Sequence, residues 1–266
     1  MKNKEEQIKL FWEDQARQFK SSPLATAPDQ YYRELEIASI AKYLQNGASI
    51  LDVGCGNGYS TLKFARQFPR CRFTGVDYSS KMVRYAAAAL KRLAPSFRGR
   101  VRFIEGDVRQ LSGVSGLAGK KFDFIVSERC LINLKNWKEQ RESLWELKKL
   151  LKPKGRIVLC ENTQEGLARL NSLRKIFKLP SIKTRWHNYY MPERVLLPFL
   201  KKEFQFLESK NIGSLYYVIS RVVYAKYSQL LGKEPDYRHP LNRIAAELPY
   251  LGEYSPNYIF LLQNKS

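Results

Sequence analysis

Carboxylates follow several apolar runs of this 266-residue chain, and their placement indicates hydrogen-bonding chemistry. Asp77 ends the run Cys71–Val76, and Asp107 ends the stretch that begins at Val101. A carboxylate accepts two hydrogen bonds at once, which suits a pair of neighbouring hydroxyl groups. In a nucleotide-binding βαβ fold, an acid at the end of the second strand binds the ribose hydroxyls. The pattern therefore predicts a ligand with a nucleoside part.

The stretch Ile50–Ser60, ILDVGCGNGYS, has the order strand, glycine loop, helix. A tight turn from strand to helix needs residues that tolerate positive φ. A ligand lying against the backbone leaves no room for Cβ atoms. Free N–H groups at the start of the next helix favour anionic or polar ligand groups. The third glycine comes one residue too early for the dehydrogenase fingerprint, so a dinucleotide site fits less well.

Apolar strands alternate with amphipathic helices over the first 160 residues. Parallel strands are expected at 49–53, 72–76, 102–105, 122–127 and 156–160, with further strands at 204–209 and 258–263. Helices are expected at 1–20, 31–44, 60–68, 80–93, 136–151 and 191–202, and Pro153–Gly155 is expected to stop the helix before the fifth strand. This alternation predicts a parallel sheet with right-handed crossovers.

Five motifs in order resemble those of the class I S-adenosylmethionine (SAM) dependent methyltransferases: LDVGCGNG, GVDYS, FIEGDV, FDFIVSE and LLKPKGRIVL. The resemblance covers roughly Ile37 to Glu161. It implies an α/β fold with a Rossmann-like, seven-stranded, mostly parallel sheet, helices on both faces and an antiparallel seventh strand. It also implies S-adenosyl-L-methionine as cofactor and no metal.

The resemblance assigns cofactor-binding residues along the first four strands. Asp52 and the glycine loop are expected at the methionine end, Asp77 at the ribose, and Asp107 with Val108 at the adenine. The full set of implied contacts is Asp52, Gly54, Cys55, Gly56, Gly58, Asp77, Tyr78, Asp107, Val108 and Ser127.

The same resemblance divides the chain into four parts. These are an N-terminal helical cap (1–45), the SAM-binding core (46–161), a first substrate insertion (162–190), and the end of the core sheet (191–266) with a second insertion (211–256). Both insertions leave the carboxyl ends of parallel strands, where ligands of open α/β sheets bind. We therefore expect them to form a lid or substrate wall.

Methyl transfer from a sulfonium is an in-line displacement, so proximity and orientation are the protein's main contribution. An oxygen nucleophile also loses a proton, so a general base helps. The candidate bases are His187, Glu161 and Glu128. Histidine titrates near neutral pH, which favours it. Each of the three can instead serve only to orient a hydroxyl group or to pack the structure.

Candidate substrate-binding residues follow the fourth strand and fill the segment 184–190, TRWHNYY. Arginine holds phosphate or carboxylate through its planar donor fork, and aromatic side chains pack on ring faces. The candidates are Arg129, Asn133, Trp186, Tyr189 and Tyr190. Together they resemble methyltransferases of bacterial polysaccharide or sugar pathways.

The charge is strongly basic, with 46 Lys and Arg against 25 Asp and Glu, a net charge of +21. Such a surface favours anionic partners, or it is simply a solvated basic surface. No apolar run is long enough to predict a transmembrane helix, and the N-terminus lacks the apolar core of a signal peptide. The four scattered cysteines suit a reducing compartment. We therefore expect a cytoplasmic protein.

The expected function is SAM-dependent methyl transfer to a small-molecule or glycan acceptor, at an oxygen of an anionic or nucleotide-linked sugar. Two alternatives stay open. The charge favours an RNA methyltransferase, and the motifs also fit a SAM-binding module without catalysis.

Overall fold

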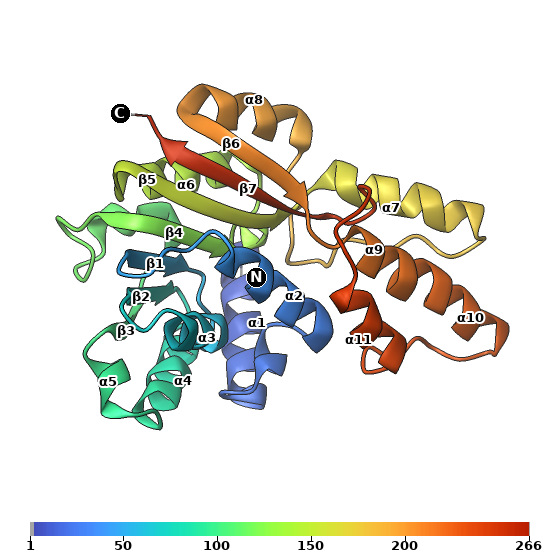
Figure 1. Cartoon of the computed structure of the whole chain (residues 1–266), viewed down its shortest axis with the longest axis horizontal. Coiled ribbons are helices and arrows are strands. Elements are labelled where there is room, and N and C mark those ends of the chain that lie inside the picture. The colour runs from blue at the N-terminus through green and yellow to red at the C-terminus, as the bar shows by residue number, and fades with distance from the viewer. Residues whose placement is uncertain (1–2, 266) are drawn as a thin grey trace.

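The computed structural model describes residues 3–265, which are built around one seven-stranded sheet (Figure 1). The strand order is β3-β2-β1-β4-β5-β7-β6; β7 runs antiparallel to both neighbours, and the other paired strands are parallel. The strands are β1 (Ser49–Val53), β2 (Arg72–Asp77), β3 (Val101–Glu105), β4 (Phe122–Glu128), β5 (Leu151–Asn162), β6 (Phe204–Asn211) and β7 (Asn257–Asn264). The predicted mostly parallel, seven-stranded sheet is confirmed.

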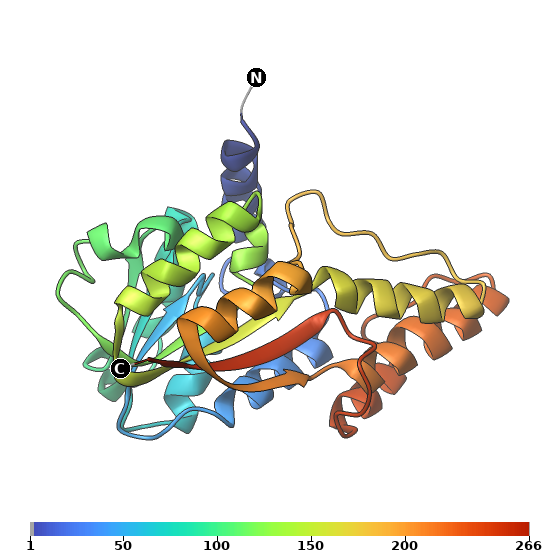
Figure 2. The same cartoon turned by 90° about the horizontal axis from the view of Figure 1, so that it is seen from above.

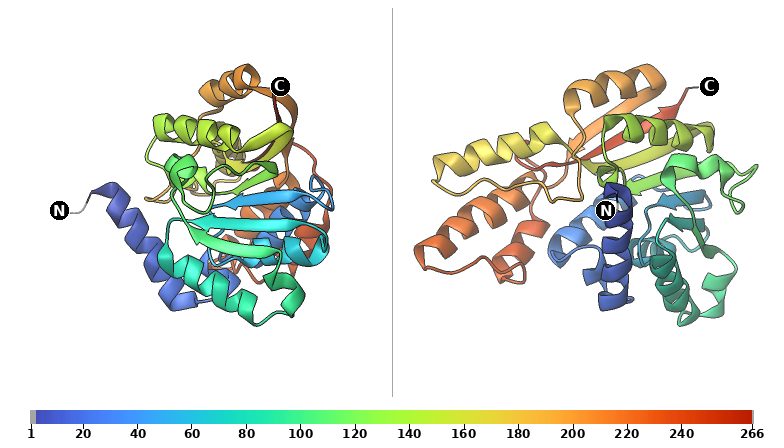
Figure 3. Two further views of the ribbon diagram at one scale, coloured as in Figure 1. Left: turned by 90° about the vertical axis from the view of Figure 1, so that its left-hand side faces the viewer. Right: turned by 180° about the vertical axis from the view of Figure 1, so that it is seen from behind.

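Helices cover both faces of the sheet (Figures 2 and 3). They are α1 (Lys4–Phe19), α2 (Gln30–Ala41), α3 (Tyr59–Gln67), α4 (Ser80–Lys91), α5 (Pro95–Arg98), α6 (Trp137–Lys149), α7 (Gln164–Ile176), α8 (Glu193–Glu203), α9 (Ser214–Tyr217), α10 (Tyr224–Leu230) and α11 (Pro240–Glu247). Short 3-10 segments are η1 (Pro23–Ala25), η2 (Val108–Gly113) and η3 (Leu131–Asn133), and η4 (Val218–Val223) is a π-helical segment. None of the helices in the described chain is both long and apolar enough to cross a bilayer.

The central strands bury both of their faces, as parallel strands between two helical layers do. Ile50 and Phe124 belong to one apolar cluster, with α2 and α3, while Leu51 and Ile125 belong to the other, with α6 and α8. Because side chains alternate along a strand, neighbouring residues enter opposite clusters. The carboxyl ends of β1, β2 and β4 are thereby held rigidly at one edge of the sheet.

The predicted helix stop at Pro153–Gly155 is wrong. Helix α6 ends at Lys149, and β5 already begins at Leu151. The register of the β4–β5 pairing shifts between Phe122 and Phe124. The stretch of β5 that contains Pro153 lies opposite this shift. Proline is tolerated in a sheet at such an irregularity because no ladder hydrogen bond is needed there.

Helix α1 begins at a capping box. The Asn3 side chain accepts a hydrogen bond from the Glu6 N–H, and the Glu6 carboxylate accepts one from the Asn3 N–H. Acidic residues in the first turn, Glu5 among them, also interact favourably with the helix dipole. This start places Glu5 in the first turn, where its carboxylate pairs with Arg109 and Lys135.

Beyond the sheet, α7 and the η4–α10 segment project together as an arm (Figures 1 and 2). We define the arm as residues 164–190 and 218–237. It has a small apolar core of its own, made of Leu170, Leu179, Val222 and Ala225. The arm therefore combines the first insertion with part of the second, although the two are distant in the sequence.

Candidate active site

A cavity of about 940 Å³ joins the sheet to the arm. At the sheet it is lined by Gly54, Gly56 and Asp77, which follow β1 and end β2. At the other end it is lined by residues 179–183, after α7, and by Gln229 and Lys233 at the end of α10. A single cavity is thus lined both by residues at the ends of two parallel strands and by residues from both parts of the arm.

A second, smaller cavity of about 60 Å³ adjoins the first and shares Gly54, Asp77 and Tyr78 with it. Its lining includes the apolar side chains of Val76, Val108, Leu111 and Leu134. A small, largely apolar cavity beside a buried carboxylate has the chemistry expected for a nucleoside, whose base is apolar on its faces and whose sugar carries two hydroxyls.

The glycine loop passes close to the segment that connects α1 with α2. Gly54 has φ +68° and Gly56 has φ +55°, a left-handed backbone that favours glycine. A Cβ atom on Gly56 would lie 2.8 Å from Cγ2 of Thr26. The connecting segment therefore covers the loop, and any side chain at Gly56 would fill the space between them.

Asp77 ties the glycine loop to the start of α4. Its Oδ2 accepts a hydrogen bond from the Gly56 N–H at 2.8 Å, and its Oδ1 accepts one from the Ser79 N–H at 2.9 Å. Burial raises the pKa of Asp77 to about 6. A carboxylate has about four acceptor positions, so the two backbone bonds leave room for ligand hydroxyls.

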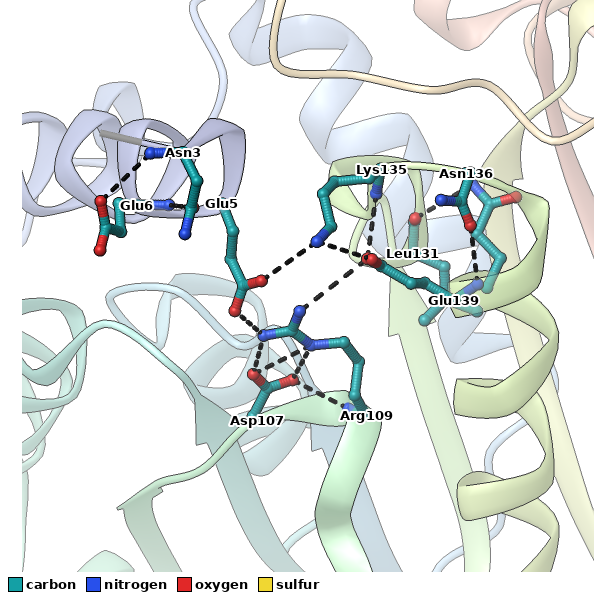
Figure 4. A network of polar contacts seen from close by, with 10 residues as sticks. Asn3, Glu5, Glu6, Asp107, Arg109, Leu131, Lys135, Asn136 and Glu139 are labelled. Carbon is teal, nitrogen blue, oxygen red and sulfur yellow. Dashed lines mark hydrogen bonds and ion pairs between the residues drawn. The ribbon is translucent and has the colours of Figure 1, made fainter. Parts of the chain in front are cut away.

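An ion-pair network closes the rim of the smaller cavity (Figure 4). Arg109 pairs with both Glu5 and Asp107, and Lys135 pairs with Glu5 at 3.3 Å and Glu139 at 3.0 Å. The hydrogen bond from Arg109 holds the pKa of Glu5 at about 2. The network fastens α1 to the segments after β3 and β4.

The residues present fit SAM. The smaller cavity suits the adenine, Asp77 lies between the two cavities where a ribose belongs, and the methionine end would follow Gly54 and Gly56 into the larger one. Thr26 Oγ1 and Tyr78 Oη are buried without a hydrogen-bond partner in the described structure, and both residues line the larger cavity. When bound, the cofactor would supply a methyl group on a sulfonium.

The sequence-predicted cofactor residues divide into two groups. Gly54, Gly56, Asp77, Tyr78, Asp107 and Val108 line one or both cavities. The other four are buried and line neither cavity: Asp52, Cys55, Gly58 and Ser127. Asp52, for example, accepts a hydrogen bond from the Thr61 hydroxyl, and a Cβ atom on Gly58 would lie 2.7 Å from the Phe103 ring.

Glu161, a candidate base, is fully buried and lines neither cavity. Its carboxylate accepts hydrogen bonds from the Ser127 hydroxyl at 2.7 Å and from the backbone N–H groups of Cys130, Leu131 and Ile132 at 2.9, 2.9 and 3.3 Å. Burial raises its pKa to about 7. The geometry gives Glu161 a positioning role for the loop after β4.

Glu128 and Arg129 line the larger cavity within a cluster of buried charges. Glu128 Oε1 lies 3.1 Å from Nη1 of Arg33, and Arg129 Nε lies 3.0 Å from Oε1 of Glu36. Burial raises the pKa of Glu36 to about 8. Both predicted residues therefore face the cavity, but each is already paired with a residue of α2.

His187 lines the larger cavity and is buried between aromatic rings. Its ring stacks on Phe11 at 4.3 Å and meets Trp12 edge-on at 5.5 Å. Burial, followed by the nearby Arg185 charge, lowers the pKa of His187 to about 4. Its Nδ1 is buried without a hydrogen-bond partner among the described residues. The imidazole is therefore neutral and has a nitrogen to offer a ligand.

The predicted substrate residues are only partly brought together. Tyr190 and Asn133 line the larger cavity, whereas Trp186 and Tyr189 line neither. The Asn133 Oδ1 accepts hydrogen bonds from Trp12 and Asn188, so this side chain joins α1 to the arm. Trp186 is 53% exposed and packs edge-on against His187 at 5.4 Å.

Several residues that line the larger cavity were not among the candidates identified from the sequence. They come from the cap, α2, β5, α9 and the second part of the arm: Trp12, Thr26, Asp29, Arg33, Asn162, Tyr217 and Arg221. A charged residue such as Arg33 within a helical pattern predicts an exposed position, because charged side chains are rarely buried unless paired. Its pairing with Glu128, 95 positions away in the chain, becomes visible only in the fold.

Known methyltransferases are similar to this chain over part of its length. The family described as a methyltransferase domain matches residues 50–155. Trans-aconitate 2-methyltransferase of Deinococcus radiodurans is 32% identical over 126 residues (45% of this chain, 43% of that protein). The ubiquinone/menaquinone biosynthesis C-methyltransferase UbiE of Syntrophotalea carbinolica is 29% identical over 133 residues (50% and 52%). The chain thus spans about half the length of the curated relatives it matches.

Among solved structures, the N-methyltransferase NodS of Bradyrhizobium japonicum, in complex with S-adenosyl-L-homocysteine, shares the fold. Its TM-score is 0.58, with 15% sequence identity, and the alignment covers 96% of this chain and 99% of that one. At this identity the likeness concerns the fold alone.

We predict that Asp77→Asn weakens binding of S-adenosylhomocysteine at least about tenfold, since hydrogen bonds to a charged group are the strong ones. Isothermal titration calorimetry measures this. Wild-type affinity should also fall as the pH drops through about 6, where Asp77 takes up a proton. Asp123→Asn, at the opposite end of the strands, is the control. Unchanged affinity of Asp77→Asn would contradict the placement of the ribose.

We predict that Glu5→Gln speeds release of S-adenosylhomocysteine about two- to fivefold, because the rim ion pairs are partly exposed and so contribute modestly. The wild-type rate should rise as the pH falls from 4.5 toward 2, since Glu5 then loses its charge. Stopped-flow displacement gives the rate. Asp14→Asn, which removes an exposed ion pair of the same helix, should leave the release rate unchanged. An equal effect in both variants would contradict the role of the rim ion pairs in retaining the ligand.

Proposed function

We propose that this chain, which is similar to methyltransferase domains over residues 50–155, transfers a methyl group from SAM to an anionic small molecule or glycan. The observation that carries the proposal is the larger cavity, which runs without interruption from the glycine loop into the arm. The acceptor would occupy the arm end, and the methyl donor the sheet end. The methylated atom we propose is an oxygen of a phosphorylated or nucleotide-linked sugar.

Arg174 supports an anionic acceptor. It lines the cavity and is only 8% exposed. Its guanidinium donates hydrogen bonds to the carbonyl oxygens of Pro180, at 2.8 Å, and Arg221. The neighbouring Arg221 pairs with Asp29, but no carboxylate of the described chain pairs with Arg174. A buried charge without a counter-ion is costly, so an anion supplied by a ligand would stabilise it.

Further cations line the same end of the cavity, namely Lys183, Arg185 and Lys233. Burial, followed by the charge of Arg221, lowers the pKa of Arg174. This is the shift expected where positive charge gathers without an anion. A phosphate or carboxylate held there would leave the rest of the acceptor extending toward the glycine loop.

An acceptor hydroxyl would lose its proton as its oxygen forms the new bond to the methyl carbon and the sulfur–carbon bond breaks. Of the three candidate bases, we favour His187, because its Nδ1 is unpartnered while the Glu161 oxygens are held by four donors. Glu128 is the alternative, since it also lines the cavity. The Glu128 carboxylate is already engaged in an ion pair with Arg33.

The two other functions make different predictions. An RNA methyltransferase would copurify with nucleic acid and bind it with strong salt dependence. A SAM-binding module would bind cofactor tightly and turn over no acceptor. A panel of sugar phosphates, sugar nucleotides and RNA, assayed for S-adenosylhomocysteine formation, separates all three.

We predict that Arg174→Gln lowers the affinity for inorganic pyrophosphate about ten- to a hundredfold, because charge-assisted hydrogen bonds are lost. Calorimetry measures the affinity, and Arg174→Lys should keep part of it. Arg169→Gln, on the same helix but paired with Glu193, is the matched control. Affinity for S-adenosylhomocysteine should not change. Equal pyrophosphate affinity in Arg174→Gln and the wild type would show that Arg174 does not bind the anion.

We predict that His187→Gln lowers turnover by about 10²- to 10⁴-fold, the usual contribution of a general base, with unchanged S-adenosylhomocysteine affinity. With a pKa of about 4, His187 stays neutral above pH 6, so kcat/KM for the acceptor, measured with SAM saturating, should show no limb near 6.5. Turnover at the wild-type level would exclude His187 and leave Glu128, whose replacement by Gln is the next test.

A further inference from the structure

The end of the arm carries an exposed apolar cluster. We define the arm tip as Ile176 and Phe177 at the end of α7 together with Tyr227, Leu230 and Leu231 of α10. Their exposed fractions are 76, 40, 55, 73 and 51%. Both helices end on the side of the arm farthest from the sheet (Figures 1 and 2). Exposed apolar side chains gathered in this way mark an interaction surface.

Basic side chains surround the arm tip. Residues 173–185 contain five Lys and Arg and no Asp or Glu. Lys175 and Lys178 flank Ile176 and Phe177, and Lys226 and Lys233 flank the α10 cluster. Lysine is depleted in protein–protein interfaces, whereas apolar side chains with adjacent lysines are typical of segments that bind an anionic membrane surface.

The larger cavity extends to this same end of the molecule. Its lining includes Leu179, Pro180 and Ile182 on one side and Gln229, Gly232 and Lys233 on the other. Gln229 lies in the last turn of α10, and the others closely follow the two helix ends that form the arm tip. A surface bound to the arm tip would therefore lie beside this part of the cavity.

We propose that the arm tip docks onto an anionic lipid bilayer. Ile176, Phe177, Leu230 and Leu231 enter the boundary between headgroups and acyl chains, and the lysines contact the phosphates. The flat, polyanionic surface matches both the apolar tip and its positive charge. Docking would place the cavity at the level of the lipid headgroups. The inference stands apart from methyl transfer, because bilayer binding needs neither cofactor nor acceptor.

Co-sedimentation of the full chain with vesicles tests the proposal. Binding to equal parts of phosphatidylcholine and phosphatidylglycerol should be at least about tenfold stronger than to phosphatidylcholine alone, and should weaken above about 0.15 M salt. Lys178→Glu and Leu230→Ser should each reduce binding at least about fivefold. Thermal unfolding confirms that the variants fold.

Matched controls lie away from the arm. Lys91→Glu, at the end of α4, makes the same change in net charge, and Leu207→Ser, on β6, removes an exposed leucine. Both should bind vesicles like the wild type. The proposal is overturned if the wild type does not bind the vesicles, or if the control variants lose as much binding as Lys178→Glu and Leu230→Ser. It is also overturned if the wild type is a dimer that Leu230→Ser dissociates. In the last case, a second copy of the chain would cover the arm tip.

Discussion

The buried carboxylate of Glu161 fixes the geometry on which the acceptor half of the site depends. It accepts hydrogen bonds from Ser127 and from three consecutive N–H groups after β4. The loop that it holds carries Arg129 and Asn133, and Asn133 in turn bonds to Trp12 of α1 and Asn188 of the arm. Four donors offset part of the cost of burying this charge, although burial still raises the pKa of Glu161. A change at Glu161 would therefore disturb the cap, the loop and the arm together.

Charge is distributed unevenly along the larger cavity. Near the sheet the buried arginines are paired, Arg33 with Glu128 and Arg129 with Glu36. Toward the arm the cations outnumber the carboxylates, and Arg174 has backbone carbonyls as its hydrogen-bond partners. Such an arrangement keeps the reacting end close to neutral and attracts an anion to the other end. It accounts for part of the high net charge; the basic side chains of the arm tip account for another part.

The sequence predicted the sheet, the glycine loop and Asp77 because these features depend on local patterns: alternating apolar runs, glycines at a strand–helix turn, and an acid at a strand end. The acceptor half was harder to predict. Trp186 and His187 are neighbours in the sequence, yet one is exposed and the other buried. Arg33 and Arg174 look like solvated helix residues, and their burial results from contacts with distant segments. The Pro153–Gly155 stretch was misassigned because a register shift lets β5 accommodate a proline.

The central claim is that methyl donor and acceptor share one cavity between the glycine loop and the arm. A crystal structure with S-adenosylhomocysteine bound tests it most directly. We expect the adenine in the smaller cavity beside Val108, the ribose on Asp77, and the sulfur facing the larger cavity with open space toward Arg174. A sulfur separated from the arm by protein, or facing an open groove on another side of the molecule, would contradict the account.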